Sequence, residues 1–201
     1  MAKTSVTELA VRTPGRPRSE EARRSILQSA LQLLEKSGFA ELSIESIAAR
    51  AGVGKATVYR WWPNKAALVV DAFVSVAEDT LRYSSTGPAE KTIREQMKRW
   101  TLVFRSPLGR VIAAVIGAGQ SEPEMLAAFH RYYIEPRRVE ARELLKEGVK
   151  NGEIRADLDF DIILDVLYGP LYLRFLVQQG PLTLDFVDAV FDIVSPGLRP
   201  R

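Results

Sequence analysis

Residues 42–68 read LSIESIAARAGVGKATVYRWWPNKAAL, and this stretch decides how the first third of the chain folds. Ser43 is suited to cap a short helix whose apolar residues recur at helical spacing. Gly52 then supplies the tolerance of positive φ that a tight turn between two helices requires. A second short helix is expected from about Gly54 to Trp61. The pattern therefore predicts two short helices that meet at a sharp glycine turn.

A longer helix is expected before this pair. Ser19 is a good N-cap residue, and Glu20 and Glu21 follow in the first turn, where carboxylates suit the helix dipole. Gly38 would end this helix. Three helices in this order are typical of a helix-turn-helix, whose last helix fits a DNA major groove about 12 Å wide. The side chains that a groove-reading helix needs are present on the second short helix: Lys55, Thr57, Tyr59 and Arg60.

The same stretch resembles the signature of the TetR family of one-component transcriptional regulators. The residues that match are Gly52, Val53, Lys55, Thr57, Tyr59, Arg60, Lys65 and Leu68. The resemblance is strong over residues 19–70, and residues 135–138, 151–155 and 168–172 look like one subgroup of the family's C-terminal domains. Trp61 and Trp62 depart from it, because the family often has His and Phe there. The resemblance implies an all-α protein with a DNA-binding domain followed by a ligand-binding and dimerisation domain.

The resemblance also implies roles for the residues of the second short helix. Lys55 would contact guanine or a phosphate, Thr57 a base edge, and Tyr59 a phosphate through its phenol. Arg60 would contact phosphate from the flank. For each of these residues taken alone, an ordinary solvated surface side chain remains the alternative.

Further DNA contacts are expected on either side of that helix. Ser43 would bind a phosphate at a helix N-terminus, Trp61 would donate its indole N–H, and Lys65 would neutralise a backbone phosphate. Arg16 and Arg18 end a basic arm, residues 1–18, and suit a narrow minor groove. A disordered basic tail is the alternative for this arm.

The charge distribution agrees with this division. Residues 1–66 hold 11 Lys and Arg against 6 Asp and Glu, whereas the remainder holds 17 against 19. An anionic partner is thus expected for the first part only. We divide the chain into the arm, a helix-turn-helix domain at 19–65, and a helical effector-binding and dimerisation domain at 66–201.

The second domain is predicted to be helical throughout, which gives about nine helices in all. Pro63 would open the fourth helix, and Pro136 would kink a long one that starts at Ser121. Gly169-Pro170 would break a later helix, and the last helix would end before Pro196.

The segment from residue 160 to 177 is apolar on nearly all faces, so it must be buried on more than one side. A homodimer with a four-helix interface follows, and its expected contacts are Leu167, Leu171, Phe186, Val190, Phe191 and Val194. Aromatic residues would line a pocket for a small hydrophobic or aromatic effector: Trp100, Phe104, Phe129, Tyr133, Tyr168, Tyr172 and Phe175. The alternative is that most of these aromatic side chains are simply core.

Several classes of protein are disfavoured. Without cysteine and with a single histidine, His130, the chain offers no zinc site, and we expect no metal and no cofactor. No apolar run reaches about 18 uncharged residues, so a soluble cytoplasmic protein is expected. The function predicted is a ligand-released repressor that binds a palindromic DNA operator. Two alternatives stay open: a regulator without ligand, activators included, and a helical enzyme with a vestigial N-terminal domain, although no catalytic constellation is present.

Overall fold

The computed structural model describes residues 16–83 and 87–200, with side chains from Glu20 onward. Within these ranges the chain is all α-helical, as predicted, and has no strand. A π-helical turn joins α7 and α8 into one continuous helix, which makes nine helices in the described part. The elements are α1 (Arg16–Ser37), α2 (Ile44–Ala51), α3 (Lys55–Tyr59), α4 (Lys65–Leu81), α5 (Ala89–Arg105), α6 (Pro107–Ala118), α7 (Pro123–Phe129), η1 (His130–Ile134), α8 (Glu135–Lys150), α9 (Phe160–Val177) and α10 (Leu184–Leu198).

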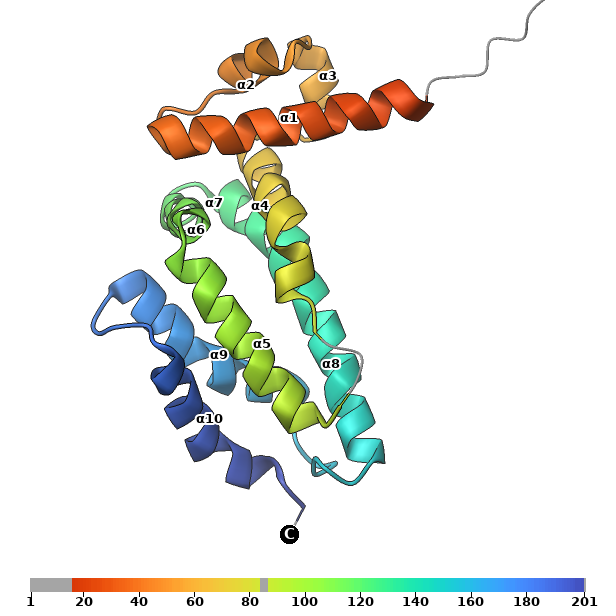
Figure 1. Cartoon of the computed structure of the whole chain (residues 1–201), viewed down its shortest axis with the longest axis vertical. Coiled ribbons are helices and arrows are strands. Elements are labelled where there is room, and N and C mark those ends of the chain that lie inside the picture. The colour runs from red at the N-terminus through yellow and green to blue at the C-terminus, as the bar shows by residue number, and fades with distance from the viewer. Residues whose placement is uncertain (1–15, 84–86, 201) are drawn as a thin grey trace, which may run out of the picture.

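The first three helices form a small unit at one end of the molecule. α1 lies across this end, α2 packs on α1, α3 packs on α2, and α4 leads from this unit into the rest of the chain (Figure 1). Its core is made by side chains with almost no exposed surface, among them Ile26, Ile47, Val58 and Leu68. Burying each of these aliphatic side chains contributes roughly 1.5–3 kcal/mol.

α1 begins at Arg16, three residues before the predicted cap Ser19. Pro17 is compatible with this earlier start, because the first turn of a helix needs no backbone N–H there. The backbone of Arg16 and Arg18 is therefore helical and does not belong to an arm that precedes the helix. The rest of the predicted arm, residues 1–15, lies outside the described residues.

α4 also begins at a different residue from the one predicted. Pro63 lies before the helix, and Asn64 is the N-cap, with its side chain accepting the Ala67 N–H at 2.8 Å. This cap satisfies one of the N–H groups that have no partner within the helix. Lys65 is then the first residue of α4.

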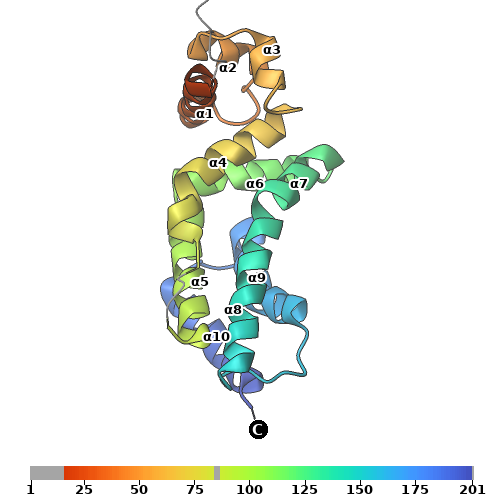
Figure 2. The ribbon, with the colours of Figure 1, turned by 90° about the vertical axis from the view of Figure 1, so that its right-hand side faces the viewer.

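The remaining helices form an elongated body together with α4, and α5 and α8 run along its length (Figure 2). The predicted irregularity at Pro136 takes the form of η1, where the Glu135 N–H bonds the His130 carbonyl five residues earlier. A proline ring crowds the carbonyl four residues before it, and the wider π-helical turn relieves that crowding.

Two other predictions about prolines were wrong. α9 continues through Gly169-Pro170, and α10 continues through Pro196 to Leu198. In α9 the buried residues Leu164, Leu167 and Leu171 flank the proline on one face and hold both halves in line. Tertiary packing thus outweighs the single backbone hydrogen bond that Pro170 removes.

No single helix in the described ranges is long and apolar enough to cross a membrane. In the same ranges, α5 and α6 together would be long and apolar enough for a membrane span, but they are bent by 85° at their junction.

Candidate functional site

The turn between α2 and α3 has the geometry that the glycine predicts. Gly52 has φ 69° and ψ 30°, the left-handed conformation. Its N–H bonds the carbonyls of Ala48 and Ala49, and the N–H of Val53 bonds Ala48 at 3.0 Å. These bonds satisfy the last carbonyls of α2 and set the direction in which α3 leaves. Val53 packs against the core.

α3 has one buried face and one exposed face. Val58 has no exposed surface, whereas Lys55, Tyr59 and Arg60 are exposed, Tyr59 by 51%. Thr57 is half-buried. The side chains predicted to read DNA are thus directed away from the protein interior, which a helix that enters a groove requires.

Lys55 already has an anionic partner within the chain. Its Nζ lies 2.5 Å from Glu45 Oε1 on α2, and this hydrogen bond lowers the pKa of Glu45. Both side chains are more than half exposed, so the ion pair contributes little to stability. A DNA phosphate or guanine could therefore replace Glu45 at small cost.

Three other predicted phosphate ligands are engaged differently. The Trp61 Nε1 is buried and has no hydrogen-bond partner among the described residues. It cannot reach a phosphate in this arrangement, so the predicted contact by Trp61 does not fit the structure. Lys65 donates to the Phe39 carbonyl at 3.2 Å and lies 4.3 Å from the centre of the Phe39 ring. Ser43 caps α2: its hydroxyl accepts the Ser46 N–H at 3.1 Å.

Asp71 on α4 connects the three-helix unit to the body. Its Oδ2 accepts from Arg23 of α1 at 2.6 Å and from the indole of Trp62 at 2.8 Å. Trp62 is 2% exposed and belongs to the core. Through Asp71, α4 is therefore bonded to both α1 and the segment that follows α3.

The body contains a cavity of about 320 Å³ between α5, α8, α9 and the residues that follow α4. Its walls are mainly aromatic and aliphatic. The lining residues are Tyr83, Gln96, Trp100, Tyr133, Ile134, Arg137, Arg138, Ala141, Leu164, Asp165, Tyr168, Gly169 and Tyr172. An apolar hollow with a few polar groups is typical of small-molecule sites.

A short chain of hydrogen bonds crosses one wall of the cavity. The hydroxyls of Tyr83 and Tyr168 are 2.8 Å apart, and Tyr168 donates to Gln96 Oε1. Gln96 Nε2 donates in turn to the carbonyl of Leu81, the last residue of α4, at 2.9 Å. Burial raises the pKa of both tyrosines, so their phenols stay protonated at neutral pH. The cavity wall is thus bonded directly to the end of α4.

Four of the seven predicted pocket residues line the cavity: Trp100, Tyr133, Tyr168 and Tyr172. The other three pack behind them as core. Phe104 stacks on Trp100 with ring centres 4.0 Å apart, Phe129 stacks on Tyr133 at 5.2 Å, and Phe175 meets Phe104 edge to face at 5.1 Å. Sequence reasoning missed the polar lining residues Gln96 on α5 and Arg137 and Arg138 on α8.

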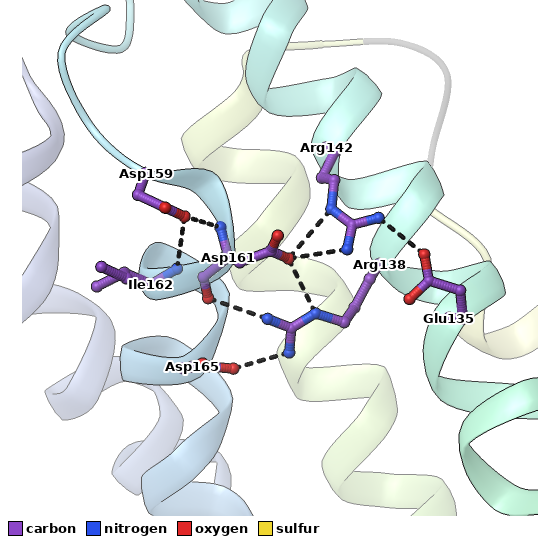
Figure 3. Close-up of polar contacts among 7 residues, drawn as sticks. All are labelled: Glu135, Arg138, Arg142, Asp159, Asp161, Ile162 and Asp165. Atoms are coloured by element: carbon purple, nitrogen blue, oxygen red, sulfur yellow. Dashed lines mark hydrogen bonds and ion pairs between the residues drawn. The ribbon is translucent and has the colours of Figure 1, made fainter. Parts of the chain in front are cut away.

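Ion pairs tie α8 to α9 at the edge of this cavity (Figure 3). Arg138 donates to Asp161 Oδ1 at 3.0 Å and to Asp165 at 2.7 Å, and Arg142 donates to Asp161 Oδ1 at 3.1 Å. The pKa of Asp161 is lowered by its hydrogen bonds from these arginines, chiefly Arg142. Asp159 caps α9: its Oδ1 accepts the N–H of Asp161 at 2.8 Å.

Comparisons with known proteins agree with both parts of this geometry. The profile of the family described as "Bacterial regulatory proteins, tetR family" matches residues 26–72. The profile described as "Tetracyclin repressor-like, C-terminal domain" matches residues 84–194, more than half of the chain. The chain belongs to the TetR family of transcriptional regulators.

Relatives of this TetR-family regulator share its length as well as its fold. The HTH-type transcriptional regulator YdeS of Bacillus subtilis is 39% identical over 86% of this chain and 87% of its own. The DNA-binding transcriptional repressor TetR of Mycobacteroides abscessus is 28% identical over 90% and 98%. The crystal structure of the TetR-family regulator SCO0332 superposes with a TM-score of 0.79 at 35% identity, over 90% of this chain and all of that one. The chain is therefore a DNA-binding transcriptional regulator, of a family that is not enzymatic.

Most of the predicted dimer contacts of this TetR-family chain are not on its surface. Leu167, Leu171, Val190 and Phe191 are at most 8% exposed within one protomer. Phe186 and Val194 are half-buried, and the Arg174 guanidinium covers the Phe186 ring at 3.5 Å. A helix that is apolar all round does not reveal in its sequence which face turns inward, and here these residues face the protomer's own core.

A different apolar stripe is exposed on the same two helices. On α9 the exposed apolar residues recur at intervals of three, four and seven: Ile162, Val166, Leu173, Leu176 and Val177. Ile193 on α10 is 81% exposed. We call these six residues the α9–α10 stripe. The five residues on α9 share one face of that helix, and large apolar side chains grouped in this way are typical of an interaction site.

Proposed function

We propose that this regulator is a repressor that binds a palindromic operator as a homodimer and is released by a small hydrophobic or aromatic effector. The observation that carries the proposal is the position of α4. Asp71, near its start, bonds α1 and Trp62, and Leu81, at its end, bonds the cavity residue Gln96. One helix therefore touches both the DNA-reading unit and the wall of the cavity.

The DNA-reading part of the proposal rests on α3. Lys55, Tyr59 and Arg60 are exposed on one side of a helix that a left-handed glycine and a buried valine fix in place. Arg and Lys contacts to phosphate make binding strongly salt-dependent, because each releases counterions from the duplex. The expected site of action is the chromosome, and thus the cytoplasm of a bacterial cell.

The dimer is proposed from the α9–α10 stripe. An exposed isoleucine, valine or leucine loses its contact with water when a second copy covers it, which favours association. A twofold axis through this surface is the usual symmetry of a homo-oligomer. Such a dimer would present two copies of α3, and reading two half-sites about 34 Å apart needs two recognition helices.

Release by an effector requires a difference in affinity between two arrangements of the protein. A molecule that binds the cavity better in the arrangement unable to bind DNA shifts the population toward it. The bond from Gln96 to Leu81 and the pair Tyr83–Tyr168 place the end of α4 where such a molecule would act. The relative in Mycobacteroides abscessus that is named a repressor supports the direction of control.

The test is selection of bound duplexes from a random pool by the purified protein, followed by footprinting. The proposal predicts a palindrome whose half-sites are one helical turn apart, with affinity that falls steeply with salt. Recovery of no sequence motif would contradict it. If no small molecule releases the protein from its footprinted site, the effector part of the proposal is wrong and a regulator without ligand is favoured.

A further inference from the structure

Arg137, on the cavity wall, has a partner for only one of the two terminal nitrogens of its guanidinium. Its side chain is 14% exposed, and its Nη2 lies 2.9 Å from Glu140 Oε1. Its Nη1, by contrast, is inaccessible to solvent and has no hydrogen-bond partner in the part of the chain that the structure describes. Leaving a buried charged donor unpaired is costly, so such a group is expected to have a partner in the working state of the protein.

The neighbouring polar groups do not supply that partner. The tyrosine hydroxyls at positions 83 and 168 are bonded to each other, and Tyr168 also bonds Gln96. Asp165, the carboxylate of the lining, accepts from Arg138 at 2.7 Å. Arg138 itself is taken up by this bond and by Asp161. The unsatisfied group of this lining residue is therefore a cationic N–H donor, which an acceptor on a ligand would meet once the guanidinium turns from its inaccessible position toward the cavity.

The rest of the wall limits the size and character of that ligand. A volume of about 320 Å³ is at the lower end of the range for small-molecule pockets, roughly 300–1,000 Å³. The rings of Trp100, Tyr133 and Tyr172 offer flat apolar surfaces, whereas a cationic ligand would be repelled by the guanidinium.

We propose that the effector is a small aromatic carboxylate of one or two rings, whose carboxylate pairs with Arg137 while its ring lies against the aromatic wall. This inference rests on the proposed function and specifies the ligand of the same cavity. A carboxylate is favoured over an uncharged acceptor because a hydrogen bond between two ions is roughly twice as strong as a neutral one. Arg137 then determines the effector specificity of the regulator.

The test is isothermal titration calorimetry of the full chain with matched pairs of probes. Benzoate, phenylacetate, 2-naphthoate and indole-3-acetate are each compared with the corresponding primary amide, which has the same shape and no charge. The inference predicts that at least one carboxylate binds about tenfold or more tightly than its amide. In Arg137→Met, which keeps the apolar stem, that preference falls to about onefold.

Arg131→Met is the matched control, because Arg131 is exposed on η1 and does not line the cavity. It should keep the full preference for the carboxylate. If the thermal melt shows that Arg137→Met does not fold, Arg137→Lys, which keeps the charge, replaces it. Its preference for the carboxylate over the amide should be smaller than that of the wild type. Amides that bind as tightly as their carboxylates, no binding by any of the four acids, or a preference that Arg137→Met retains would each overturn the inference.

The same probes separate this inference from the proposed function. If an amide releases the selected duplex from the wild-type protein as well as its acid does, the effector-released repressor stands and the carboxylate is wrong. If a carboxylate binds through Arg137 but no duplex is ever bound, the carboxylate inference stands and the proposed repressor function is wrong.

Discussion

Gly52 and Gly54 are two residues apart and have different backbone requirements. Gly52 has φ 69°, whereas Gly54, the N-cap of α3, has φ −74°, and an added Cβ would meet nothing within 4 Å at either position. Gly52→Ser should therefore lose roughly 1–2 kcal/mol of stability through backbone strain alone. Gly54→Ser should be close to neutral, because serine is a preferred N-cap residue. Urea unfolding of both variants checks this, and equal losses would contradict it.

The sequence predicted residue properties that depend on local geometry. The positive φ at Gly52 follows from the need for a tight turn, and it is confirmed. The states of Trp61 and Lys65 were not predictable in this way. They depend on neighbours from other segments: the Arg23 guanidinium lies 6.0 Å from the Trp61 ring, and Lys65 bonds Phe39.

Among the elements, α8 and α9 are joined by a cluster that responds to acid. The arginine hydrogen bonds hold the pKa of Asp161 below its ordinary value of 3.8, so its ionised form favours folding. This contribution is complete above pH 3.8 and is lost as the pH falls through the lower folded value. Asp161→Asn should thus lower the urea midpoint at pH 7 and converge with the wild type in acid.

Asp165→Asn is the companion variant, because Asp165 bonds Arg138 alone whereas Asp161 bonds two arginines. Its loss at pH 7 should be smaller than that of Asp161→Asn. A gap between wild type and Asp161→Asn that stays constant from pH 7 to pH 3 would show that the ion pairs do not stabilise the contact.

The apolar periodicity of the sequence predicted that the helices exist, but it did not predict where some of them end or which of their faces are buried. Pro170 and Pro196 were expected to interrupt helices that packing in fact keeps continuous. The sequence also did not predict which face of α9 turns inward. Leu167 and Val166 are both aliphatic, yet Leu167 is buried and Val166 is 47% exposed. Only the positions of the neighbouring helices decide between them.

For the whole molecule, the α9–α10 stripe predicts a dimer that one charge can disrupt. Val166→Lys places a cation within the stripe and should shift the protein toward monomer in sedimentation velocity at micromolar concentration. Val76→Lys is the matched control, since Val76 is 49% exposed on α4, away from the stripe. A wild-type monomer, or a dimer that both variants retain, would contradict the predicted interface.

The cavity is also a property of the whole molecule. Its aromatic residues were visible in the sequence as a class, and four of the seven line it. Its polar groups were not recognisable, because Tyr83, Gln96 and Arg137 meet only when α4, α5 and α8 pack together. The run 135–138 was noted for its resemblance to a subgroup, without any indication that Arg137 faces a hollow.

The central claim is that α3 presents its exposed side chains to a duplex, and fluorescence anisotropy with a duplex recovered by selection tests it most directly. The variant Lys55→Ala/Tyr59→Phe should bind about 10–100-fold more weakly than the wild type, since each lost contact to base or phosphate costs on the order of 1 kcal/mol. Trp61→Phe, which replaces the indole and its buried N–H by a smaller ring, should bind close to the wild type. A double variant whose Kd equals that of the wild type would contradict the claim.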